Sequence, residues 1–292
     1  MSTLRQALLH QLRLLAVALQ FLTRIPVPAL QGWRPEWLSQ CMAYFPVVGA
    51  LVGLLCGLVL VAAAAWWPPT VAVGVSMAFS VWLTGAFHED GWADTCDALG
   101  GAVSRERALL IMKDSRIGTY GAVGLILMLG IKAAVLVSLV SPLITELNEA
   151  QTSHVHQVLL GWAWLGLICC HAGSRLVPVL ISAVLPYAGD AEHAKAKPLA
   201  TRVSFRQVIA ATLTTASVVA ALWLWMWLNG WPTGTLWQAM GYAAVGMGLG
   251  GLVVGRWLQQ RLGGFTGDGL GASQQVAELA GLLGWLMVIR PA

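Results

Sequence analysis

Charged residues are scarce in this sequence, and their scarcity excludes an ordinary soluble domain. Lys, Arg, Asp and Glu make up 10% of the 292 residues, and 58% of the residues are hydrophobic. A soluble domain carries about 25% charged residues. The composition therefore indicates a protein embedded in a membrane. The net charge of +4 is explained by basic loops at one membrane face, so we expect no nucleic-acid partner.

Cysteines are also few, and they do not suit a disulfide framework. The chain has five, an odd number. Cys169 and Cys170 are adjacent within an apolar run, which is typical of buried small hydrophobic side chains. The N-terminal stretch has no small-residue cleavage pattern, so we expect no signal peptide. No internal repeat of about 20–50 residues stands out, and no low-complexity segment does.

Seven apolar segments are long enough to cross a membrane, which takes about 20 residues. They are 43–67, 70–88, 118–141, 157–187, 207–228, 238–258 and 267–289. The segment 7–23 is shorter and has Arg13 in its middle, so we expect an interfacial or re-entrant helix there. The expected fold is all-α. It is a polytopic membrane helix bundle that forms one domain over 1–292, with an N-terminal interfacial segment (1–42) and a transmembrane bundle (43–289).

The connections between these segments alternate between basic and non-basic. The basic ones contain Arg24 and Arg34, then Arg105, Arg107, Lys113 and Arg116, then Lys195, Lys197, Arg202 and Arg206, and finally Arg256 and Arg261. The connections at 68–69, 142–156 and 229–237 contain no Lys or Arg. Because basic loops of membrane proteins lie on the cytoplasmic side, we expect that face to carry 88–117, 188–206 and 256–266.

Carboxylates gather in one of these loops, in the stretch HEDGWADTCD. Asp90, Asp94 and Asp97 are spaced i, i+4, i+7, which places all three on one face of a helix. Like charges at this spacing destabilise a helix unless a cation neutralises them. Mg²⁺ takes one or two carboxylates together with waters and phosphate oxygens. The alternative is that the acids only favour a helix N-terminus, which accounts for Glu89 and Asp90 better than for the other two.

Basic and acidic residues also precede the next span, in the stretch MKDSRIGTYG. Lys113 and Arg116 lie beside Asp114. They either anchor the span at the membrane surface or bind phosphate, and Gly118 and Gly121 permit a close backbone approach. Spacing alone does not decide between the two interpretations.

Further ionisable residues fall inside the predicted spans, where they are costly and usually functional. Asp268 opens the last span, and Glu278 lies about two to three helical turns further on. Arg175, in the fourth span, is interpreted as a site residue. Lys132 either extends to the membrane surface or pairs with Glu278. Thr266 precedes the last span and is a candidate helix cap.

The position of most charges favours an enzyme over a transporter. A transporter would place ionisable groups near the midplane, often in broken helices of two related halves, and no such halves are apparent. Charges at a cytoplasmic edge suit phosphoryl transfer, in which a metal neutralises charge and a carboxylate accepts the proton of an incoming hydroxyl. His88 borders the acids and is a candidate for this chemistry, whereas His171 is expected to be a packed, hydrogen-bonded histidine.

Several stretches together resemble the signature blocks of the cobalamin-5′-phosphate synthase (adenosylcobinamide-GDP ribazoletransferase) family. They are FHEDGWADTCDALGG, MKDSRIGTYG, GGFTGDGLGA, FLTRIPVP and AYFPVVGALVG, and the resemblance extends from Phe21 to about Leu279. It implies an inner-membrane enzyme with Mg²⁺ as cofactor. The implied reaction joins adenosylcobinamide-GDP to α-ribazole, or to its 5′-phosphate, and gives adenosylcobalamin, or its 5′-phosphate, and GMP. The lipid bilayer is the other implied partner, and a homo-oligomer is left open.

The resemblance also implies roles for individual residues. Asp97 is the expected base, with Asp94 and His88 as alternatives. The magnesium ligands would be drawn from Asp90, Asp94, Asp97, Asp114 and Asp268. The phosphates would be bound by Lys113, Arg116 and Arg175, with Thr266 as a further substrate contact and Glu278 as a further candidate.

Two departures from the family pattern flank the acids, because an apolar residue is expected at Glu89 and Leu at Trp92. Neither replaces an acid. The central block also differs from the signature of CDP-alcohol phosphotransferases, since Ala93 is followed by Asp94 and not by Arg. A lipid-synthesis enzyme of that kind is therefore the second interpretation, and an ion-coupled transporter is the third.

Overall fold

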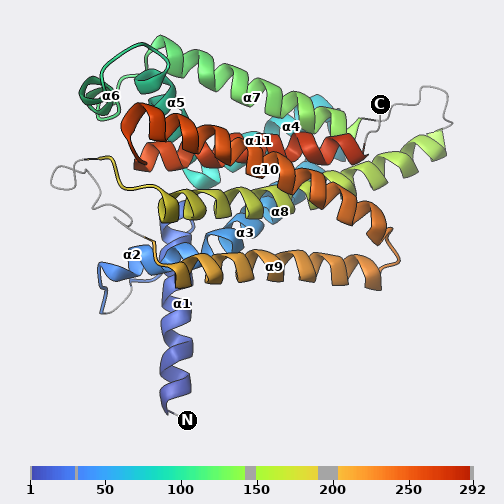
Figure 1. Ribbon diagram of the computed structural model, residues 1–292. Coiled ribbons are helices and arrows are strands. Elements are labelled where there is room, and N and C mark those ends of the chain that lie inside the picture. The colour runs from blue at the N-terminus through green and yellow to red at the C-terminus, as the bar shows by residue number, and fades with distance from the viewer. Residues whose placement is uncertain (1, 30–31, 142–148, 190–202, 290–292) are drawn as a thin grey trace.

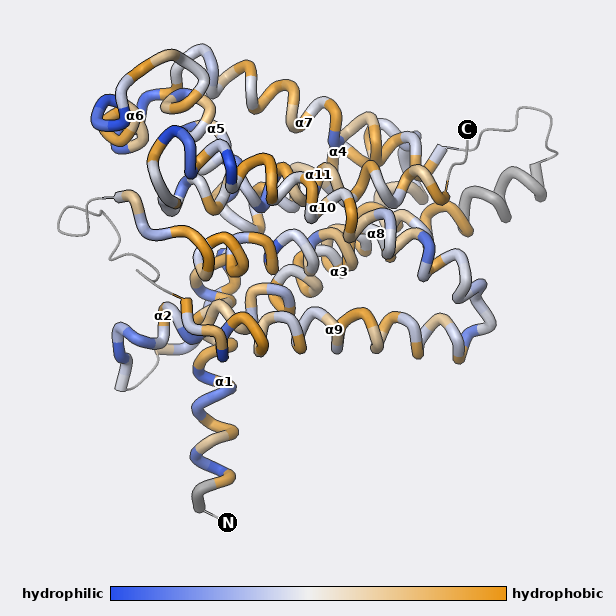
Figure 2. The backbone as a smooth tube through the Cα atoms, viewed as in Figure 1, coloured by the Kyte–Doolittle hydropathy of each residue, from blue (hydrophilic) through white to orange (hydrophobic). Residues whose placement is uncertain are grey.

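The computed structural model describes residues 2–29, 32–141, 149–189 and 203–289, and every named element in these ranges is a helix. Long helices run side by side through the body of the molecule (Figure 1). Most of the residues along these helices are apolar by hydropathy (Figure 2). The predicted all-α membrane bundle is confirmed.

The elements in chain order are α1 (Ser2–Leu22), α2 (Glu36–Gln40), the 3₁₀ helix η1 (Cys41–Tyr44), α3 (Phe45–Ala64), α4 (Pro69–Thr84), α5 (Phe87–Leu99), α6 (Arg105–Ile111), α7 (Thr119–Val140), α8 (Glu149–Val184), α9 (Phe205–Leu228), α10 (Thr233–Leu262) and α11 (Gly267–Ile289). In the described ranges, six helical segments are long and apolar enough to cross a membrane, and the pair α4–α5 makes up to seven. The prediction of about seven spans is confirmed.

The predicted span 70–88 is not one straight helix, and this part of the prediction is corrected. Its helix α4 has 16 residues, and the axis then bends by 88° into α5. Gly85 and Ala86 join the two helices with φ of 69° and 59°. Two successive left-handed residues cannot continue a right-handed helix. The break turns α5 across the end of the bundle, and the acids lie on α5.

Helix α1 leaves the bundle at one end and runs across the direction of the long helices (Figure 1). Its outer leucines are uncovered, with Leu4 80%, Leu8 62% and Leu12 53% exposed. It is not among the candidate spans. This arrangement is typical of a helix lying in the membrane interface, although the interfacial location of 7–23 stays a prediction.

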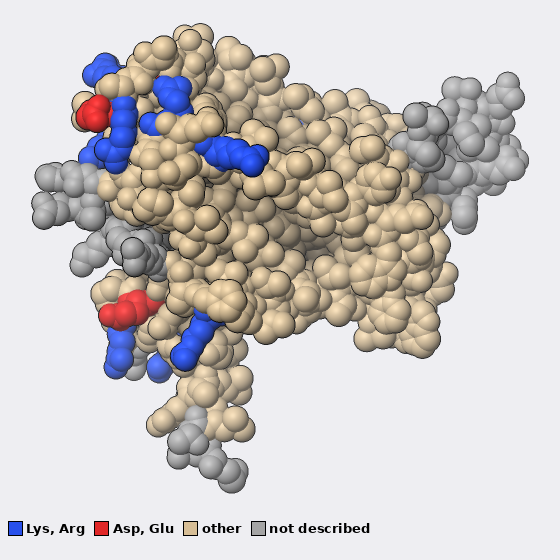
Figure 3. Space-filling view, in the orientation of Figure 1, with Lys and Arg blue, Asp and Glu red and all other residues tan. Residues whose placement is uncertain are grey.

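Charged side chains gather at the end of the bundle that carries α2, α5 and α6, and the rest of the visible face is almost uncharged (Figure 3). Arg105, Arg116 and Arg261 belong to this polar end. The chain therefore collects at one end several basic loops that the sequence assigns to one membrane face. Lys195 and Lys197 of the third basic loop lie outside the described residues.

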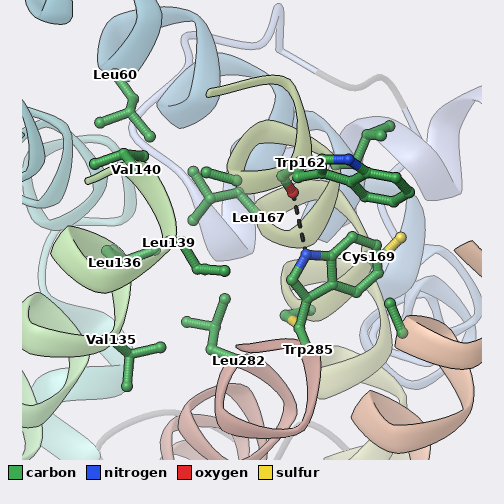
Figure 4. Close-up of a cluster of buried hydrophobic side chains, with 14 of the residues drawn as sticks. Leu60, Val135, Leu136, Leu139, Val140, Trp162, Leu167, Cys169, Leu282 and Trp285 are labelled. Atoms are coloured by element: carbon green, nitrogen blue, oxygen red, sulfur yellow. Dashed lines mark hydrogen bonds between the residues drawn. The ribbon is translucent and has the colours of Figure 1, made fainter. Parts of the chain in front are cut away.

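Toward the other end, aromatic and branched side chains fill the space between the helices. Trp285 of α11 is fully buried, and its indole Nε1 donates a hydrogen bond to the carbonyl of Trp162 on α8, at 3.1 Å. Figure 4 shows this pair with Leu136, Leu139 and other side chains packed around it. Because the indole N–H has a partner, the large ring is buried without an unsatisfied donor.

Candidate active site

Helix α5 presents two chemically different faces. Asp90 is exposed and Asp94 and Asp97 are half-buried, as expected for an i, i+4, i+7 series on one face. His88 and Glu89 are buried, with 5% and 7% of their surface exposed. One face therefore carries accessible acids, and the other turns a histidine and a glutamate into the bundle.

Helix α11 crosses α5 at a glycine contact that brings two acids together. The backbone of Asp268 lies directly against Gly91, and Gly271 lies against the same glycine. Asp90, the neighbour of Gly91, is close enough to Asp268 for their charges to interact. Two carboxylates in this position repel each other unless a cation lies between or beside them. The sequence-based prediction had no means of pairing residues so far apart along the chain.

The two sides of this contact tolerate a methyl group differently, which gives a matched pair of variants. A Cβ at Gly91 would lie 2.8 Å from the carbonyl oxygen of Asp268, whereas a Cβ at Gly271 would meet its nearest atom at 3.4 Å. We expect Gly91→Ala to separate α5 from α11. The catalytic activity of membranes that contain this variant, per amount of protein, should fall at least about tenfold, the effect of a barrier change near 1.4 kcal/mol. Gly271→Ala should stay within about twofold of the parent, well under 1 kcal/mol. Equal activities of the two variants would show that this contact does not position the acids.

Asp97 fixes the start of α7. Its two carboxylate oxygens accept hydrogen bonds from the backbone N–H groups of Gly118 and Gly121, each at 2.7 Å. These are N–H groups that a helix leaves unsatisfied in its first turn, and a carboxylate there also interacts favourably with the helix dipole. Cβ atoms at either glycine would collide with the Asp97 side chain. The close approach expected at these glycines is therefore made by a side chain of α5.

The connection between α6 and α7 contains the predicted phosphate-binding residues. Arg116 makes an exposed ion pair with Asp114, with Nη2 and Oδ2 2.6 Å apart. The carboxylate raises the pKa of Arg116 above its usual range. Lys113 is exposed. This segment ends at Gly118, so it lies next to the acidic face of α5.

Thr266 begins α11, as its reading as a helix cap requires. Its hydroxyl oxygen accepts a hydrogen bond from the backbone N–H of Gly269 at 3.1 Å, and the hydroxyl donates to the sulfur of Met112 at 3.6 Å. The capping interpretation is confirmed. The same contacts hold the start of α11 against the segment that follows α6.

Two arginines that the sequence marked only as topology signals anchor this end of the molecule. Arg261 donates from Nη1 to the carbonyl of Leu99 at 2.6 Å and from Nη2 to that of Gly101 at 2.7 Å. Arg105 donates from Nε to the carbonyl of Leu262 at 2.7 Å. Cations are favourable at helix C-termini, so these side chains hold the ends of α5 and α10. Nothing in the local sequence distinguishes them from other loop arginines.

A second group of polar side chains is buried further along α11 than Asp268. We call it the buried charge cluster; it is formed by Lys132, His171, Arg175, Gln274 and Glu278. Both Lys132 and Arg175 are ion-paired with Glu278, the latter at 3.8 Å. Oε2 of Glu278 lies 3.0 Å from Nδ1 of His171, and the same oxygen accepts a hydrogen bond from Nε2 of Gln274 at 2.6 Å. Glu278 is ten residues beyond Asp268, about 15 Å along α11. Of the two alternatives left open for Lys132, the structure shows the pairing with Glu278, and the prediction of a packed, hydrogen-bonded His171 is confirmed.

The structure thus separates the predicted site residues into two groups. Asp90, Asp94, Asp97 and Asp268 lie around the crossing of α5 and α11, with Lys113, Asp114 and Arg116 in the adjoining loop. His88 faces the buried charge cluster, since its charge interactions are with Arg175 and Glu278. The first group is partly exposed at the charged end of the bundle, and the second is buried between helices.

The acids at the crossing suit a hard cation that shares its ligands with substrate. In the described part of the chain, no three His, Cys, Asp or Glu side chains are arranged to hold a metal ion by themselves. Mg²⁺ does not need three, because it binds through one or two carboxylates plus phosphate oxygens and waters. Asp90 and Asp268 supply two such oxygen donors in repulsive proximity, so the residues present fit the ion.

Comparison with known sequences agrees with these features over nearly the whole chain. The profile of the family described as "Cobalamin-5-phosphate synthase" matches residues 14–286. An adenosylcobinamide-GDP ribazoletransferase of Leptothrix cholodnii is 51% identical over 96% of this chain and 97% of its own length. Proteins of the same name from Vibrio parahaemolyticus and Albidiferax ferrireducens are 38% and 40% identical, and they cover 94% and 92% of this chain and 92% and 95% of their own lengths. No solved structure matches this fold at a significant level. With its acidic half-helix at the polar end of a membrane bundle, and with matches of this extent, the chain belongs to the cobalamin-5-phosphate synthase family.

Proposed function

We propose that this membrane protein is an adenosylcobinamide-GDP ribazoletransferase, the activity named for its relatives. The hydroxyl of α-ribazole, or of its 5′-phosphate, attacks the phosphorus that carries the cobinamide. A new P–O bond forms, the P–O bond to GMP breaks, and adenosylcobalamin or its 5′-phosphate is released with GMP. The observation that carries the proposal is the acidic face of α5 against Asp268, at the charged end of the bundle.

Asp90 and Asp268 are the first candidates to hold Mg²⁺, with Asp94 one helical turn from Asp90 as a third. The bound ion would neutralise charge on the pyrophosphate and on the leaving GMP. Asp114 is a weaker candidate ligand than these three residues, because its oxygens already accept three hydrogen bonds from the guanidinium of Arg116. The donor set at the helix crossing supports this order.

A carboxylate on α5 would accept the proton of the incoming hydroxyl. Both oxygens of Asp97 bind the start of α7, which supports a positioning role for that residue, and His88 faces the buried charge cluster. We therefore assign the base to Asp94, which lies between Asp90 and Asp97 on the accessible face. A general base contributes about 10²–10⁴-fold to the rate.

Lys113 and Arg116 would bind the phosphates of the nucleotide and stabilise the charge of departing GMP. Both are exposed in the segment next to the acidic face. Arg116 would exchange its ion pair with Asp114 for a phosphate when substrate binds. The ion pair of Arg175 with Glu278 supports a role for this arginine in holding helices together.

The polar end of the bundle is assigned to the cytoplasmic face of the bacterial inner membrane. The support is the basic loops at that end, because Lys and Arg are retained on the cytoplasmic side during insertion. Nucleotide-linked substrates are made in the cytoplasm, so an active site on this face can bind them directly. The second and third interpretations, a CDP-alcohol phosphotransferase and a transporter, are not adopted. The reason is that the family match covers residues 14–286, which include the acids of α5 and Asp268.

The test is a transfer assay with membranes that contain the full chain. Incubation with adenosylcobinamide-GDP, α-ribazole and Mg²⁺ should release GMP and corrinoid product in equal amounts. Membranes without the protein, and reactions without α-ribazole, are the controls. GMP release that does not depend on α-ribazole, or no release at all from correctly inserted protein, would contradict the proposed activity.

Removal of the metal should abolish this activity reversibly. EDTA in excess over Mg²⁺ is expected to reduce GMP release to the level of control membranes, since the two carboxylates at the crossing and the substrate phosphates share the cation. Added Mg²⁺ should restore the rate, whereas Ca²⁺, which prefers more ligands and longer distances, should restore less. Activity unchanged by chelation would contradict the metal assignment.

A further inference from the structure

Glu89 is an acid with no role in the proposed reaction. It follows His88 in the acidic stretch, yet its side chain points away from the accessible acids and is 7% exposed. One carboxylate oxygen, Oε1, accepts a hydrogen bond from Nε2 of Gln275 on α11 at 3.2 Å, and the other, Oε2, has no hydrogen-bond partner among the residues that the structure describes. A buried carboxylate with an unsatisfied oxygen is costly unless nearby cations compensate it.

Two cations of the buried charge cluster provide that compensation. Gln275, the hydrogen-bond partner of Glu89, is the chain neighbour of Gln274, which binds the same Glu278 that pairs with both cations. Glu89 therefore lies close enough for its charge to act on Lys132 and Arg175. Arg175 is 1% exposed, and within the described part of the chain its Nε is a buried donor without a hydrogen-bond partner. The attraction between charges acts over several ångströms in a low-dielectric interior, so direct contact is not required.

The cluster is electrically balanced only when α5 is in place. Lys132 and Arg175 contribute two positive charges, and Glu278 contributes one negative charge. Glu89 is the second negative charge, and it is the one that α5 carries. If α5 moved away from α11, a net positive charge would be left in a membrane-embedded interior, which is strongly unfavourable.

We propose that Glu89 is a positioning residue that holds the half-helix α5, and with it Asp90 and Asp94, against α11 by balancing the charge of Lys132 and Arg175. The polar contact to Gln275 fixes its place, and the charge provides the attraction. The link to catalysis rests on the proposed function, but the position of α5 does not.

Cys96 reports the position of α5 without any enzyme assay. It is on α5, 8% exposed, and its sulfur packs against Gly124 of α7. If α5 detaches, this thiol becomes accessible to a maleimide, and mass spectrometry resolves its modification from that of the other cysteines. Cys169 on α8, also 8% exposed, serves as the internal control for general loosening.

The experiment is a charge cycle with Glu89→Gln, Lys132→Met and the double variant. Glutamine keeps the shape of Glu89 and can still accept the hydrogen bond of Gln275, so only the charge is lost. We expect Cys96 in Glu89→Gln to be modified about tenfold faster than in the parent. In the double variant the charges are balanced again, so the rate of Cys96 modification should return to within about threefold of the parent rate. Such a departure from additivity is expected of interacting charges. Cys169 should be unaffected in Glu89→Gln and in the double variant, in which the charges are balanced again. The variant Glu106→Gln, which removes an exposed acid on α6, should match the parent.

The transfer assay on the same variants adds a second measurement. In Glu89→Gln, the Mg²⁺ concentration for half-maximal activity should rise by a factor several times larger than the factor by which kcat at saturating Mg²⁺ falls. The reason is that the acids are displaced and not removed. A Cys96 rate equal to that of the parent in Glu89→Gln would overturn the inference. So would a double variant modified as fast as the faster single variant. Either result leaves the transfer activity itself untouched, and loss of GMP release without a change at Cys96 would count against the proposed base or metal ligands instead.

Discussion

Asp90→Asn and Asp94→Asn should each reduce GMP release to background while the protein still inserts into the membrane. Asp90 is assigned to the metal, which supplies several kcal/mol of charge stabilisation, so its loss should cost at least roughly 10²-fold in rate. Asp94 is assigned to the base, and its loss should cost about 10²–10⁴-fold. Initial rates at saturating substrates, normalised to the amount of protein in the membrane, give the measurement.

Glu106→Gln is the matched control for both variants. Glu106 is an exposed acid in the first turn of α6 at the same polar end, and it has no part in the proposed site. Its replacement should leave the rate within about twofold, a change of well under 1 kcal/mol. Substantial activity in both aspartate variants would refute the assignment of the acidic face of α5 as the active site. An equal loss in all three variants would indicate that net charge at this end, and not particular carboxylates, supports activity.

Glu278→Leu should produce the largest loss of stability of any single substitution considered. Glu278 is 1% exposed and is the common partner of Lys132, His171 and Arg175. Removing one partner of a buried ion pair leaves an uncompensated charge and costs about 3–5 kcal/mol. We expect little folded protein, or a thermal unfolding temperature in detergent that is clearly lowered relative to the parent.

Ser273→Ala provides the comparison on the same helix. Ser273 is fully buried and donates its hydroxyl to the carbonyl of Leu270 at 2.7 Å, a local bond within α11 whose loss costs about 1 kcal/mol. Its unfolding temperature should stay close to that of the parent. If Glu278→Leu unfolds at the same temperature as Ser273→Ala, the buried charge cluster does not stabilise the bundle.

Local patterns in the sequence predicted much of the architecture. Membrane spans follow from the length of apolar runs, and the shared face of Asp90, Asp94 and Asp97 follows from helical periodicity. Both are properties of contiguous residues, so no knowledge of the fold is needed. The bend at Gly85 and Ala86 escaped the prediction, because an alanine in a left-handed conformation leaves no trace in hydropathy.

Most of the contacts that individual side chains make could not be predicted from the sequence. The sequence did not predict the ion pair of Arg175 with Glu278 or the hydrogen bonds from the start of α7 to Asp97. Each contact joins residues that are distant along the chain, and a charge in isolation carries no information about which opposite charge it meets.

The sequence by itself determined that this chain crosses a membrane several times, which residues lie in its loops, and which family its motifs resemble. Those conclusions depend on the cost of burying charge in lipid and on the 3.6-residue helical repeat, which act locally. Only the tertiary structure decided that Gly91 brings Asp90 to Asp268 and that Glu89 is buried against Gln275 of α11. Those pairings depend on how α5 bends and packs against α11, and packing is a property of the whole bundle.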